Sequence, residues 1–431
     1  MDLRLASTSK PLQGTVTVPG DKSLAHRAAL FAALAEGESV VRRYPDSGVT
    51  RAMRGALASL GVESTLEDGI LRIKGNGYRS FPKPGCVAYC GNSATTIRLL
   101  AGAVAGTATS CTLDGSEGLR KRPMGRIANP LEQMGAIVRT TNGCAPMTFE
   151  ERHLQGLSYD VPVASAQVLS CLQIAALGAS SESRFTVPGP VRDHTVRMLS
   201  AMGAEIESRG WTTIVKPLAK ALSPLNGTLA GDISSATFLL CAAALVPESC
   251  ITITGVGVNE TRTGILDVLK AMGARISCSH AHDECGEPVA DLTLEAAPLK
   301  AVEIKGDLVV RAIDEFPAIA AVAAFAEGTT VVREAKELRY KETDRISAIV
   351  TQLRALGAEV EEFDDGFAIQ GRTLKGGTAR ANGDHRLAMS MALCGLRAPV
   401  TVEGAEILNE SFPEFVPTLV SLGARVESLN G

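Results

Sequence analysis

The stretch LRALGAEVEE, residues 353–362, has the pattern of a helix that ends and a strand that begins. Gly357 can adopt the left-handed conformation that closes a helix, and the residues after it alternate as in a strand. Five more stretches share this pattern: LASLGVEST from Leu57, LEQMGAIVRT from Leu131, LSAMGAEIES from Leu199, LKAMGARISC from Leu269 and LVSLGARVES from Leu419. The chain therefore repeats one helix–strand junction six times.

A second set of six segments lies between these junctions. Each begins with a polar residue that can cap a helix and continues as an Ala- and Leu-rich helix, apolar on nearly all sides, which predicts that it is buried. The six are DKSLAHRAALFAALA from Asp21, NSATTIRLLAGAVAG from Asn92, SAQVLSCLQIAALGA from Ser165, DISSATFLLCAAALV from Asp232, DEFPAIAAVAAFAEG from Asp314 and DHRLAMSMALCGL from Asp384. The repeated unit has roughly 70 residues, with two helices and several strands.

Two domains of three units each fit this pattern better than a solenoid, whose repeats are shorter. GDKSLAHRA at Gly20 and GDISSATFL at Gly231 are matching starts of two halves, and the segment before Gly20 is expected to pair with the second half. We therefore expect residues 1–17 and 231–431 to form a domain that contains both termini and residues 18–230 to form an inserted second domain. The active site is expected in the cleft between them.

The composition excludes several classes of partner. The net charge of −4 gives no general attraction to nucleic acid or to an anionic membrane. The longest apolar run, residues 238–246, is far shorter than the ~20 residues of a membrane span. The first ten residues lack the apolar centre of a signal peptide, and ten cysteines without a framework favour reduced thiols. These features predict a cytoplasmic protein.

Basic residues gather where the apolar helices are expected to begin. Any one of them alone is more often a solvated surface charge. Together they place positive charge at the positive ends of the helix dipoles, which is unfavourable unless bound phosphate or carboxylate compensates it. No nucleotide-binding motif of the Walker or dinucleotide type is present. The sequence therefore predicts a site for small anions, with these basic residues: Lys22, Arg27, Arg98, Arg120, Lys121, Arg122, Arg192, Lys341, Arg345 and Arg386.

The same motifs resemble those of the 5-enolpyruvylshikimate-3-phosphate (EPSP) synthase family, in family order over essentially the whole chain. They are GDKSLAHR, GNSATTIRL, LRKRPM, VASAQV, RDHT, DEFPAIA, RYKETDR and GDHRLAM. The resemblance implies a mixed α/β (α+β) fold of two similar domains joined by a two-strand hinge. Each domain would contain three βαβαββ units with buried parallel helices, an inside-out α/β barrel. VPVASAQV, VRDHTVRML and SFPEF are closer to the glyphosate-tolerant bacterial class than to the class of enteric bacteria and plants.

The resemblance also implies a reaction. The chain would transfer the enolpyruvyl group of phosphoenolpyruvate to the 5-hydroxyl of shikimate 3-phosphate and release phosphate, as a transferase of the shikimate pathway of aromatic amino acid biosynthesis. We expect a monomer with no cofactor, no metal, and no nucleic-acid or membrane partner. Glyphosate is expected to be a weak competitor.

The resemblance assigns site residues by motif match. Shikimate 3-phosphate would be held by Lys22, Ser23, Arg27, Ser165, Ala166, Gln167, Arg192, Asp314 and Lys341. Phosphoenolpyruvate would be held by Lys22, Ala94, Arg122, Gln167, Arg345 and Arg386. Asp314, as the cap of a buried helix, is the candidate base for the 5-hydroxyl. Lys341 and Glu342 are the candidates for proton delivery, and Lys22 lies between the two substrates.

Simpler interpretations stay open for several of these residues. Without the family resemblance, Asp314 would be interpreted as an ordinary helix cap, and Asp232 is interpreted in that way. The charged residues from Lys341 to Arg345 alone would be a helix face with local ion pairs. His385 is expected to support or pack rather than to catalyse. Ala94 stands where glyphosate-sensitive members have glycine, and either its methyl group blocks glyphosate or it only improves helix propensity.

Two features depart from the family pattern. Many relatives have a lysine just before the [ST]FP motif, whereas Asn409 and Glu410 precede Ser411 here, which puts a phosphate contact from that segment in doubt. The stretch CSHAHDEC brings together four residue types that bind zinc, Cys278, His280, His282 and Cys285. Because its spacing matches no common zinc site and it is expected in a polar connection, we expect no metal there.

Two other functions compete with this one. UDP-N-acetylglucosamine enolpyruvyl transferase shares the fold and the enolpyruvyl donor, but that family has Lys-Asn in place of Lys22-Ser23. It also has a cysteine in the loop matching residues 114–122, where this chain has none. A catalytically inactive relative that serves as an interaction scaffold is the second alternative, although nearly every charged position of the family is present.

Overall fold

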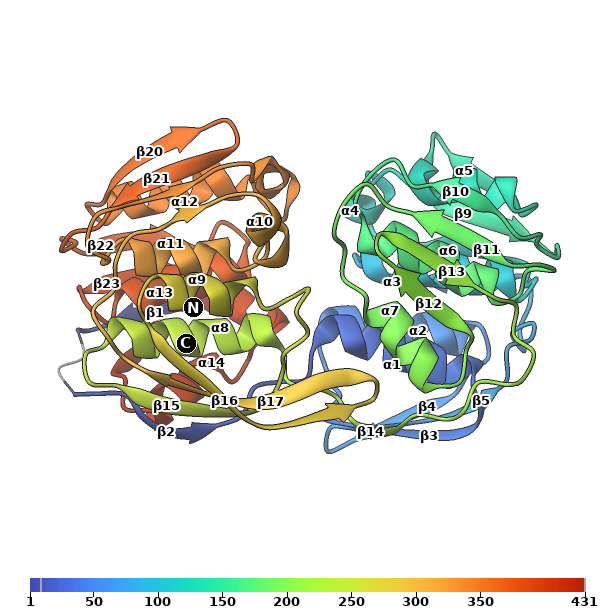
Figure 1. The fold of residues 1–431 in the computed structure, drawn as a ribbon, viewed down its shortest axis with the longest axis horizontal. Coiled ribbons are helices and arrows are strands. Elements are labelled where there is room, and N and C mark those ends of the chain that lie inside the picture. Colours follow the sequence, from blue (N-terminus) through green and yellow to red (C-terminus); the bar gives the residue numbers. More distant parts are fainter. Residues whose placement is uncertain (8–9, 430–431) are drawn as a thin grey trace. The chain divides into compact units, whose positions relative to one another are not determined.

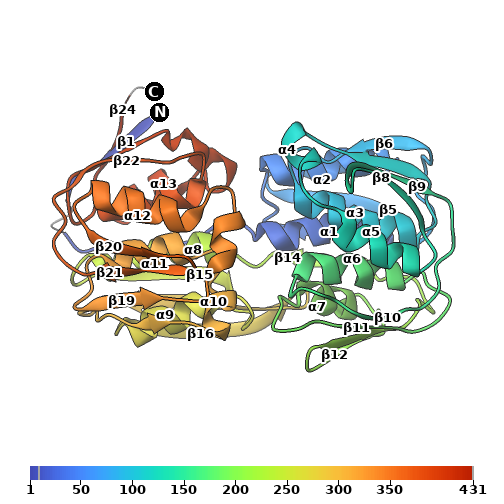
Figure 2. The ribbon, with the colours of Figure 1, turned by 90° about the horizontal axis from the view of Figure 1, so that it is seen from above.

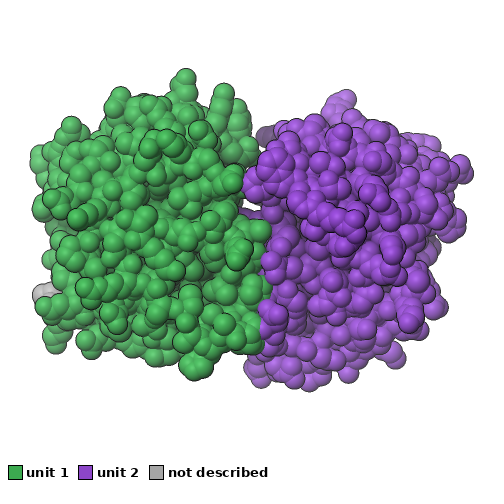
Figure 3. Space-filling model, in the orientation of Figure 1, with its two compact units in different colours: residues 1–19, 231–282, 288–431 green, residues 20–230, 283–287 purple. Residues whose placement is uncertain are grey.

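The computed structural model describes residues 1–7 and 10–429. The chain divides into two compact units, coloured separately in Figure 3. Unit 1 comprises Met1–Pro19, Gly231–His282 and Pro288–Gly431, and unit 2 comprises Gly20–Ala230 and Asp283–Glu287. Each unit is described below by itself.

Unit 2 contains three four-stranded sheets among the described residues. In each sheet the first two strands are parallel and the other neighbours are antiparallel. In sheet order the strands are β14 (Asn226–Thr228), β3 (Glu36–Arg42), β5 (Ile70–Asn76) and β4 (Ser64–Glu67); β6 (Cys86–Tyr89), β7 (Cys111–Asp114), β9 (Cys144–Glu150) and β8 (Ile137–Thr141); and β10 (Ser158–Asp160), β11 (Ser183–Thr186), β13 (Thr212–Val215) and β12 (Ile206–Arg209).

The three apolar helices predicted for the first half of the chain lie between these sheets (Figure 1, Figure 2). They are α1 (Lys22–Leu34), α3 (Ala94–Gly106) and α6 (Ala166–Ala176), and α2 (Gly48–Ser59), α4 (Glu117–Arg120), α5 (Gly125–Gln133) and α7 (His194–Ala201) complete the unit. Helices α3 and α6 approach so closely that a Cβ atom on Gly102 would lie 2.2 Å from the Cys171 carbonyl oxygen. Only glycine allows this packing.

Unit 1 also has three four-stranded sheets in its described part. Their strands are β16 (Arg275–Glu284), β17 (Glu287–Glu295), β15 (Cys250–Gly257) and β2 (Gln13–Val16); β18 (Glu303–Ile304), β19 (Thr329–Val332), β21 (Gly366–Gln370) and β20 (Glu359–Phe363); and β22 (Gly377–Arg380), β23 (Val400–Glu403), β1 (Asp2–Leu5) and β24 (Val426–Leu429). Its helices are α8 (Ile233–Leu245), α9 (Gly264–Ala271), α10 (Asp307–Arg311), α11 (Phe316–Ala323), α12 (Arg345–Ala355), α13 (His385–Cys394) and α14 (Phe415–Ser421), with 3-10 turns η1 (Lys336–Tyr340) and η2 (Ala405–Glu410).

Strands from distant parts of the chain complete the repeats. Strand β2 pairs in parallel with β15, with Val16 opposite Ile253, as the sequence predicted for the segment before Gly20. Strand β1 lies antiparallel between β23 and β24. In unit 2 the late strand β14 pairs in parallel with β3. These pairings require the chain to pass between the units near Gly20 and Gly231.

The segment Asp283–Glu287 is an addition that the sequence did not indicate. It is the turn between β16 and β17 and belongs to unit 2, although the rest of both strands belongs to unit 1. Glu287 Oε1 lies 2.8 Å from His194 Nδ1, and both side chains are buried.

The prediction of a polar connection around Cys278 was wrong. Residues Arg275–Glu284 form the long strand β16, with mostly exposed side chains.

The predicted helix caps are confirmed at five of the six apolar helices. The side chains of Asp21, Ser93, Ser165, Asp232 and Asp384 each accept a hydrogen bond from a backbone N–H in the first turn. The prediction for Asp314 was wrong. Helix α11 begins at Phe316 with Glu315 at the cap position and no side-chain cap bond, because the Asp314 carboxylate faces cationic side chains instead.

No helix in the described ranges is long and apolar enough to cross a membrane. All ten cysteines are free thiols.

Candidate active site

The predicted site residues fall into two sets, one in each unit. Unit 2 contains Lys22, Ser23, Arg27, Ala94, Arg122, Ser165, Ala166, Gln167 and Arg192, and unit 1 contains Asp314, Lys341, Glu342, Arg345 and Arg386. In unit 2 these residues lie at or near the first turns of α1, α3 and α6, in the loop after α4, or just before α7. Exposed backbone N–H groups at such helix starts attract anions.

The start of α1 presents Lys22 and Ser23, both partly exposed. One turn later Arg27 is buried and connects three helices. Its Nε donates to Thr195 Oγ1 at 2.8 Å and its Nη2 donates to Ser170 Oγ at 2.9 Å. Arg27 therefore positions α1, α6 and α7 relative to one another, in addition to any role in binding substrate.

A buried histidine joins the starts of α1 and α3, and sequence analysis did not single it out. His26 Nδ1 lies 2.6 Å from the Lys22 carbonyl oxygen, and its Nε2 lies 3.3 Å from Ser93 Oγ. Burial lowers the pKa of His26 to about 4, so the ring is neutral at pH 7. Because a carbonyl can only accept, the proton is assigned to Nδ1, and Nε2 accepts from the Ser93 hydroxyl.

The first turns of α3 and α6 are joined by a side-chain amide. Gln167 Nε2 donates to Thr95 Oγ1 at 2.8 Å, and Gln167 Oε1 accepts from Arg98 Nη1 at 2.5 Å. Ala94, the first residue of α3, is 7% exposed. The polar side chains at the start of α3 thus connect this helix to the start of α6.

Three arginines in this part of unit 2 have no carboxylate partner among residues 1–7 and 10–429. They are Arg98, Arg122 and Arg126. Burial lowers the pKa of Arg98, and the charges of Arg122 and Arg126 lower it further. By contrast, Arg120 pairs with Asp114 on the surface. Uncompensated positive charge is therefore concentrated around Arg98, and an anion would neutralise it.

In unit 1 the candidate base lies beside a candidate proton donor. Lys341 Nζ is 3.5 Å from Asp314 Oδ1, and Arg345 Nη1 is 3.8 Å from the same oxygen. Asp314 and Lys341 are partly exposed, whereas the Arg345 side chain is 1% exposed. The Asp314 carboxylate and the Lys341 ammonium group therefore meet at a partly exposed position in unit 1.

Arg345 is held by several carboxylates. Its Nε donates to Asp384 Oδ2 at 2.7 Å, and its Nη2 donates to Glu342 Oε2 at 2.7 Å. Burial alone would lower the pKa of Arg345, but Asp384 and Glu342 outweigh it and raise the pKa. The predicted proton-delivery residue Glu342 is therefore an ion-pair partner of Arg345 in this structure.

Arg386 belongs to a neighbouring polar cluster. Its Nη1 donates to the Asp314 carbonyl oxygen at 3.2 Å and lies 3.8 Å from Glu315 Oε1. Glu315 is buried and accepts from Ser234 Oγ at 2.5 Å, and Arg262 Nη2 also donates to that hydroxyl, at 3.0 Å. The sequence analysis missed Glu315 and Arg262. The available signal was a second acidic residue, Glu315, directly after the candidate base Asp314 in an otherwise apolar segment.

Two other features that the sequence singled out are the segment before Ser411 and the CSHAHDEC stretch. Asn409 and Glu410 are exposed, and Ser411 is buried with no hydrogen-bond partner for its hydroxyl in the described structure. In the CSHAHDEC stretch, His280 pairs with Asp291 at 3.0 Å. Within the described residues, no group of three or more His, Cys, Asp or Glu side chains is arranged to hold a metal ion.

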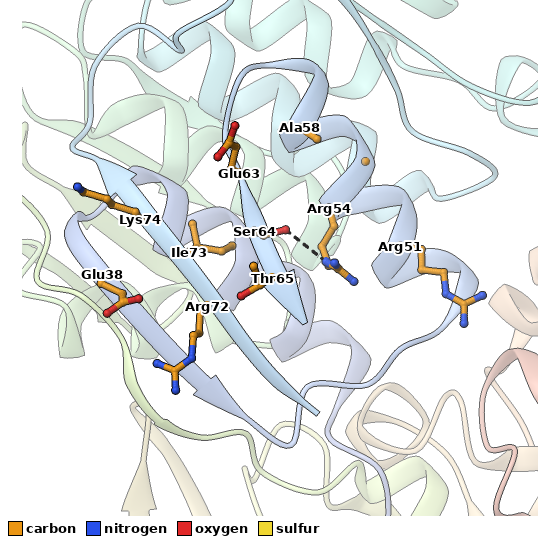
Figure 4. A pocket seen from close by; sticks show the side chains of 11 residues that line it. Glu38, Arg51, Arg54, Ala58, Glu63, Ser64, Thr65, Arg72, Ile73 and Lys74 are labelled. Atoms are coloured by element: carbon orange, nitrogen blue, oxygen red, sulfur yellow. Dashed lines mark hydrogen bonds between the residues drawn. The ribbon is translucent and has the colours of Figure 1, made fainter. Parts of the chain in front are cut away.

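A groove of about 730 Å³ on unit 2 lies between α2 and the strands β3, β4 and β5 (Figure 4). Arg54 points toward Ser64 there, with Nε 3.4 Å from Oγ. Its charged lining residues are of both signs: Glu38, Arg51, Arg54, Glu63, Arg72 and Lys74. The predicted site residues are not among its lining, and its mixed charge does not single out one ligand.

Comparison with known proteins identifies the family. Residues 6–419 match the model of EPSP synthase (3-phosphoshikimate 1-carboxyvinyltransferase). The chain belongs to the EPSP synthase family. Proteins named 3-phosphoshikimate 1-carboxyvinyltransferase from Syntrophomonas wolfei and Geobacter metallireducens are 44% and 45% identical to it. The alignments cover 97% of this chain and 99% and 98% of the two relatives.

Solved structures agree with this assignment. EPSP synthase from Acinetobacter baumannii matches with a TM-score of 0.93 and 37% identity over 99% of both chains. The enolpyruvyl transferase NikO from Streptomyces tendae, at 20% identity and a TM-score of 0.78, shares the fold. The predicted mixed α/β fold class and the transferase activity of EPSP synthases are thus confirmed. The roles of individual residues stay predictions.

Proposed function

We propose that the chain transfers the enolpyruvyl group of phosphoenolpyruvate to the 5-hydroxyl of shikimate 3-phosphate, with the roles of its residues as follows. A proton adds to the methylene carbon of phosphoenolpyruvate while the 5-hydroxyl oxygen bonds to the adjacent carbon and gives up its own proton. That carbon then loses the phosphate oxygen as inorganic phosphate. A proton leaves the new methyl group at the same time, which restores the double bond.

Asp314 and Lys341 would move these protons. The Asp314 carboxylate is the proposed base for the 5-hydroxyl, and the Lys341 ammonium is the proposed proton donor to the methylene carbon. Their separation of 3.5 Å is the observation that supports the proposal most directly, because a base and an acid must both reach one reacting centre. Glu342 is the weaker candidate for proton delivery, since its carboxylate pairs with Arg345.

The anionic groups of the substrates would be held by cations and helix starts. For phosphoenolpyruvate, Arg122 in unit 2 and Arg345 and Arg386 in unit 1 are the proposed cationic ligands, with Lys22 shared between the two substrates. Gln167 would contact both substrates, and the Ala94 backbone would line the subsite. For shikimate 3-phosphate the other proposed ligands are Ser23, Arg27, Ser165, Ala166 and Arg192. Arg122 supports this assignment because no carboxylate neutralises it in the described part of the chain.

We also propose that Ala94 makes the enzyme tolerant of glyphosate. Ala94 is the first residue of α3, so its methyl group projects beside the N–H groups that would face a bound anion. Phosphoenolpyruvate is compact, whereas glyphosate is longer and would collide with the methyl group. The expected monomeric state and cytoplasmic location stay predictions as well.

Release of inorganic phosphate tests the proposed function. Mixing the protein with phosphoenolpyruvate and shikimate 3-phosphate should release phosphate, and neither substrate alone should do so. Turnover only with UDP-N-acetylglucosamine would reassign the acceptor. No turnover with either acceptor, together with a folded protein, would favour the inactive scaffold.

A further inference from the structure

We infer that Arg98 is a positioning residue that fixes the orientation of the Gln167 side-chain amide, with Thr95 as its second contact. The inference rests on the proposed function, in which Gln167 contacts the substrates. Arg98 itself is not among the proposed substrate ligands.

The two ends of the Gln167 amide have different requirements. Its Oε1 can only accept, and it receives the Arg98 Nη1 donor at 2.5 Å. Its Nε2 can only donate, and it reaches Thr95 Oγ1 at 2.8 Å. A guanidinium group has donors and no acceptor, whereas a hydroxyl can do both. Arg98, rather than Thr95, therefore determines which way the amide points.

A reversed amide would place its NH₂ group against the guanidinium and lose a charge-assisted hydrogen bond. In the observed orientation the second N–H of Nε2 has no protein partner within the described residues. That N–H is suited to an anionic oxygen, the type of group that phosphoenolpyruvate and shikimate 3-phosphate both carry. The Gln167 amide could present either its oxygen or its NH₂ group to the substrate. Arg98 thus holds it with the NH₂ group as the hydrogen-bond donor.

The packing of α3 on α6 fixes this pair. Arg98 lies four residues before Gly102, and Gln167 lies four residues before Cys171, whose carbonyl oxygen would be 2.2 Å from a Cβ atom on Gly102. Since one helical turn is 3.6 residues, both side chains lie about one turn from this close approach of the two helices. The pair therefore rests on rigid elements rather than on a loop.

The electrostatics of Arg98 argue against a purely structural role. Its guanidinium group is partly buried beside two other arginines and has no carboxylate partner in the described parts of the chain. By contrast, the buried Arg345 is paired with Asp384, so its charge is compensated within the protein, whereas the charge of Arg98 is left for an anion to compensate.

A double-mutant cycle tests the inference with the full-length protein. We expect Arg98→Met to lower kcat/KM for phosphoenolpyruvate by ~10- to 100-fold, the range for a hydrogen bond to a charged group. In the Gln167→Ala background the same substitution should cost at most ~3-fold, because the group that it positions is absent. Additive losses would mean that Arg98 acts without Gln167 and would overturn the inference.

Arg126→Met is the matched control. It removes a positive charge from the neighbourhood of Arg98 without touching Gln167 and should lower kcat/KM by at most ~3-fold. A loss as large as that of Arg98→Met would overturn the inference in favour of a simple charge effect. If Arg98→Met does not fold, Arg98→Gln enters the same cycle with the same criterion, because its neutral amide can face Gln167 with either end.

A crystal structure of Arg98→Met without substrates gives a readout that is independent of turnover. We expect the Gln167 side chain to lose its single conformation and its contact with Thr95. An unchanged Gln167 would overturn the inference even in an active enzyme. A wild-type protein that releases no phosphate refutes the proposed function instead, and the Gln167 conformation still decides the positioning role.

Discussion

Helices α1 of unit 2 and α8 of unit 1 begin alike and then diverge. Both have 13 residues and an aspartate cap whose carboxylate accepts from the N–H of the second helical residue, a serine in each case. Four residues into each helix a side chain bonds back to the carbonyl of the first residue, His26 in α1 and Thr237 in α8. The next residue is Arg27 in α1 and Phe238 in α8.

The replacement of Arg27 in α1 by Phe238 in α8 gives the two helices different surroundings, polar for α1 and apolar for α8. Phe238 packs edge-to-face against Phe415 with ring centroids 6.2 Å apart, so it belongs to the core of unit 1. Arg27 instead bonds to Thr195 and Ser170 in the interior of unit 2. The same repeat thus supports either a core or a hydrogen-bonded network at equivalent positions.

The cations of the two units also differ in their partners. In unit 1 the cations Lys341, Arg345 and Arg386 lie 2.7–3.8 Å from carboxylates. In the described part of unit 2, Arg98 and Arg122 have none. The proposed roles follow this difference: proton transfer is proposed at the neutralised cluster of unit 1, and anion binding is proposed at the unpaired cations of unit 2. The following experiments are ordered by expected effect.

The largest effect is expected from Asp314→Asn in unit 1. The substitution keeps the size of the side chain and removes the base, so kcat should fall by ~10²- to 10⁴-fold while substrate binding changes little. Steady-state phosphate release measures both. The control is Asp365→Asn, which changes a surface carboxylate of the same unit that pairs with Arg333, and it should keep normal turnover. Turnover close to normal in Asp314→Asn would exclude Asp314 as the base.

The next effect concerns an arginine of unit 2 that no carboxylate neutralises. Arg122→Gln should weaken binding of phosphoenolpyruvate, with KM ~10- to 100-fold higher, because a hydrogen bond to a charged group contributes ~1.5–3 kcal/mol. Arg120→Gln, two residues earlier, removes an exposed arginine that already pairs with Asp114 and should leave KM unchanged. If both substitutions raise KM equally, the absence of a carboxylate partner does not identify the arginine that binds phosphoenolpyruvate.

A third experiment examines the start of α3. Ala94→Gly should make glyphosate inhibit ~10- to 100-fold more strongly, because removing one overpacked methyl group recovers ~1–3 kcal/mol. Inhibition constants measured against varied phosphoenolpyruvate give the answer, and KM for that substrate should stay similar. If parent and variant are inhibited equally, Ala94 only improves helix propensity.

The smallest effect is a pH dependence of stability that His26 confers on unit 2. The unfolded histidine has a pKa near 6.5, above the folded value of about 4, so the unfolded state binds more protons between these values. Stability is therefore fully present above pH 6.5 and is lost as the pH falls toward 4. Between pH 7.5 and 5.5 the loss should be about 1 kcal/mol.

Urea unfolding of the wild type and of His26→Gln at both pH values measures this term. Since the glutamine does not titrate, the variant should lose about 1 kcal/mol less than the wild type over that range. An identical pH dependence in the two proteins would show that His26 is not held neutral in the folded protein.

Much of the fold could be predicted from short stretches of sequence. The six glycine junctions and five of the six helix caps depend on groups a few residues apart, which is why they could be identified without a structure. Asp314 failed as a cap because Lys341 and Arg345, distant in sequence, face its carboxylate. The strand around Cys278 was missed because its polar side chains are mostly exposed and carry no apolar alternation.

The candidate site divides in the same way. The sequence motifs identified residues such as Arg98, Gln167 and Arg345. They could not show which side chains these residues contact through hydrogen bonds or ion pairs. Arg98 and Gln167 are 69 positions apart, and Arg345 and Asp384 are 39 apart. The predictions also overlooked the turn Asp283–Glu287, whose Glu287 meets His194 across 93 positions. Such contacts depend on how helices and strands pack.

The repeated unit, the buried helices with most of their caps, and the residue types that can bind anions follow from local backbone and side-chain chemistry, so they could be predicted from the amino-acid sequence. The packed structure was needed to show which cations are neutralised, which arginine contacts the Gln167 amide, and which histidine stays neutral. Charge compensation and desolvation depend on every group within a few ångströms, whatever its distance along the chain.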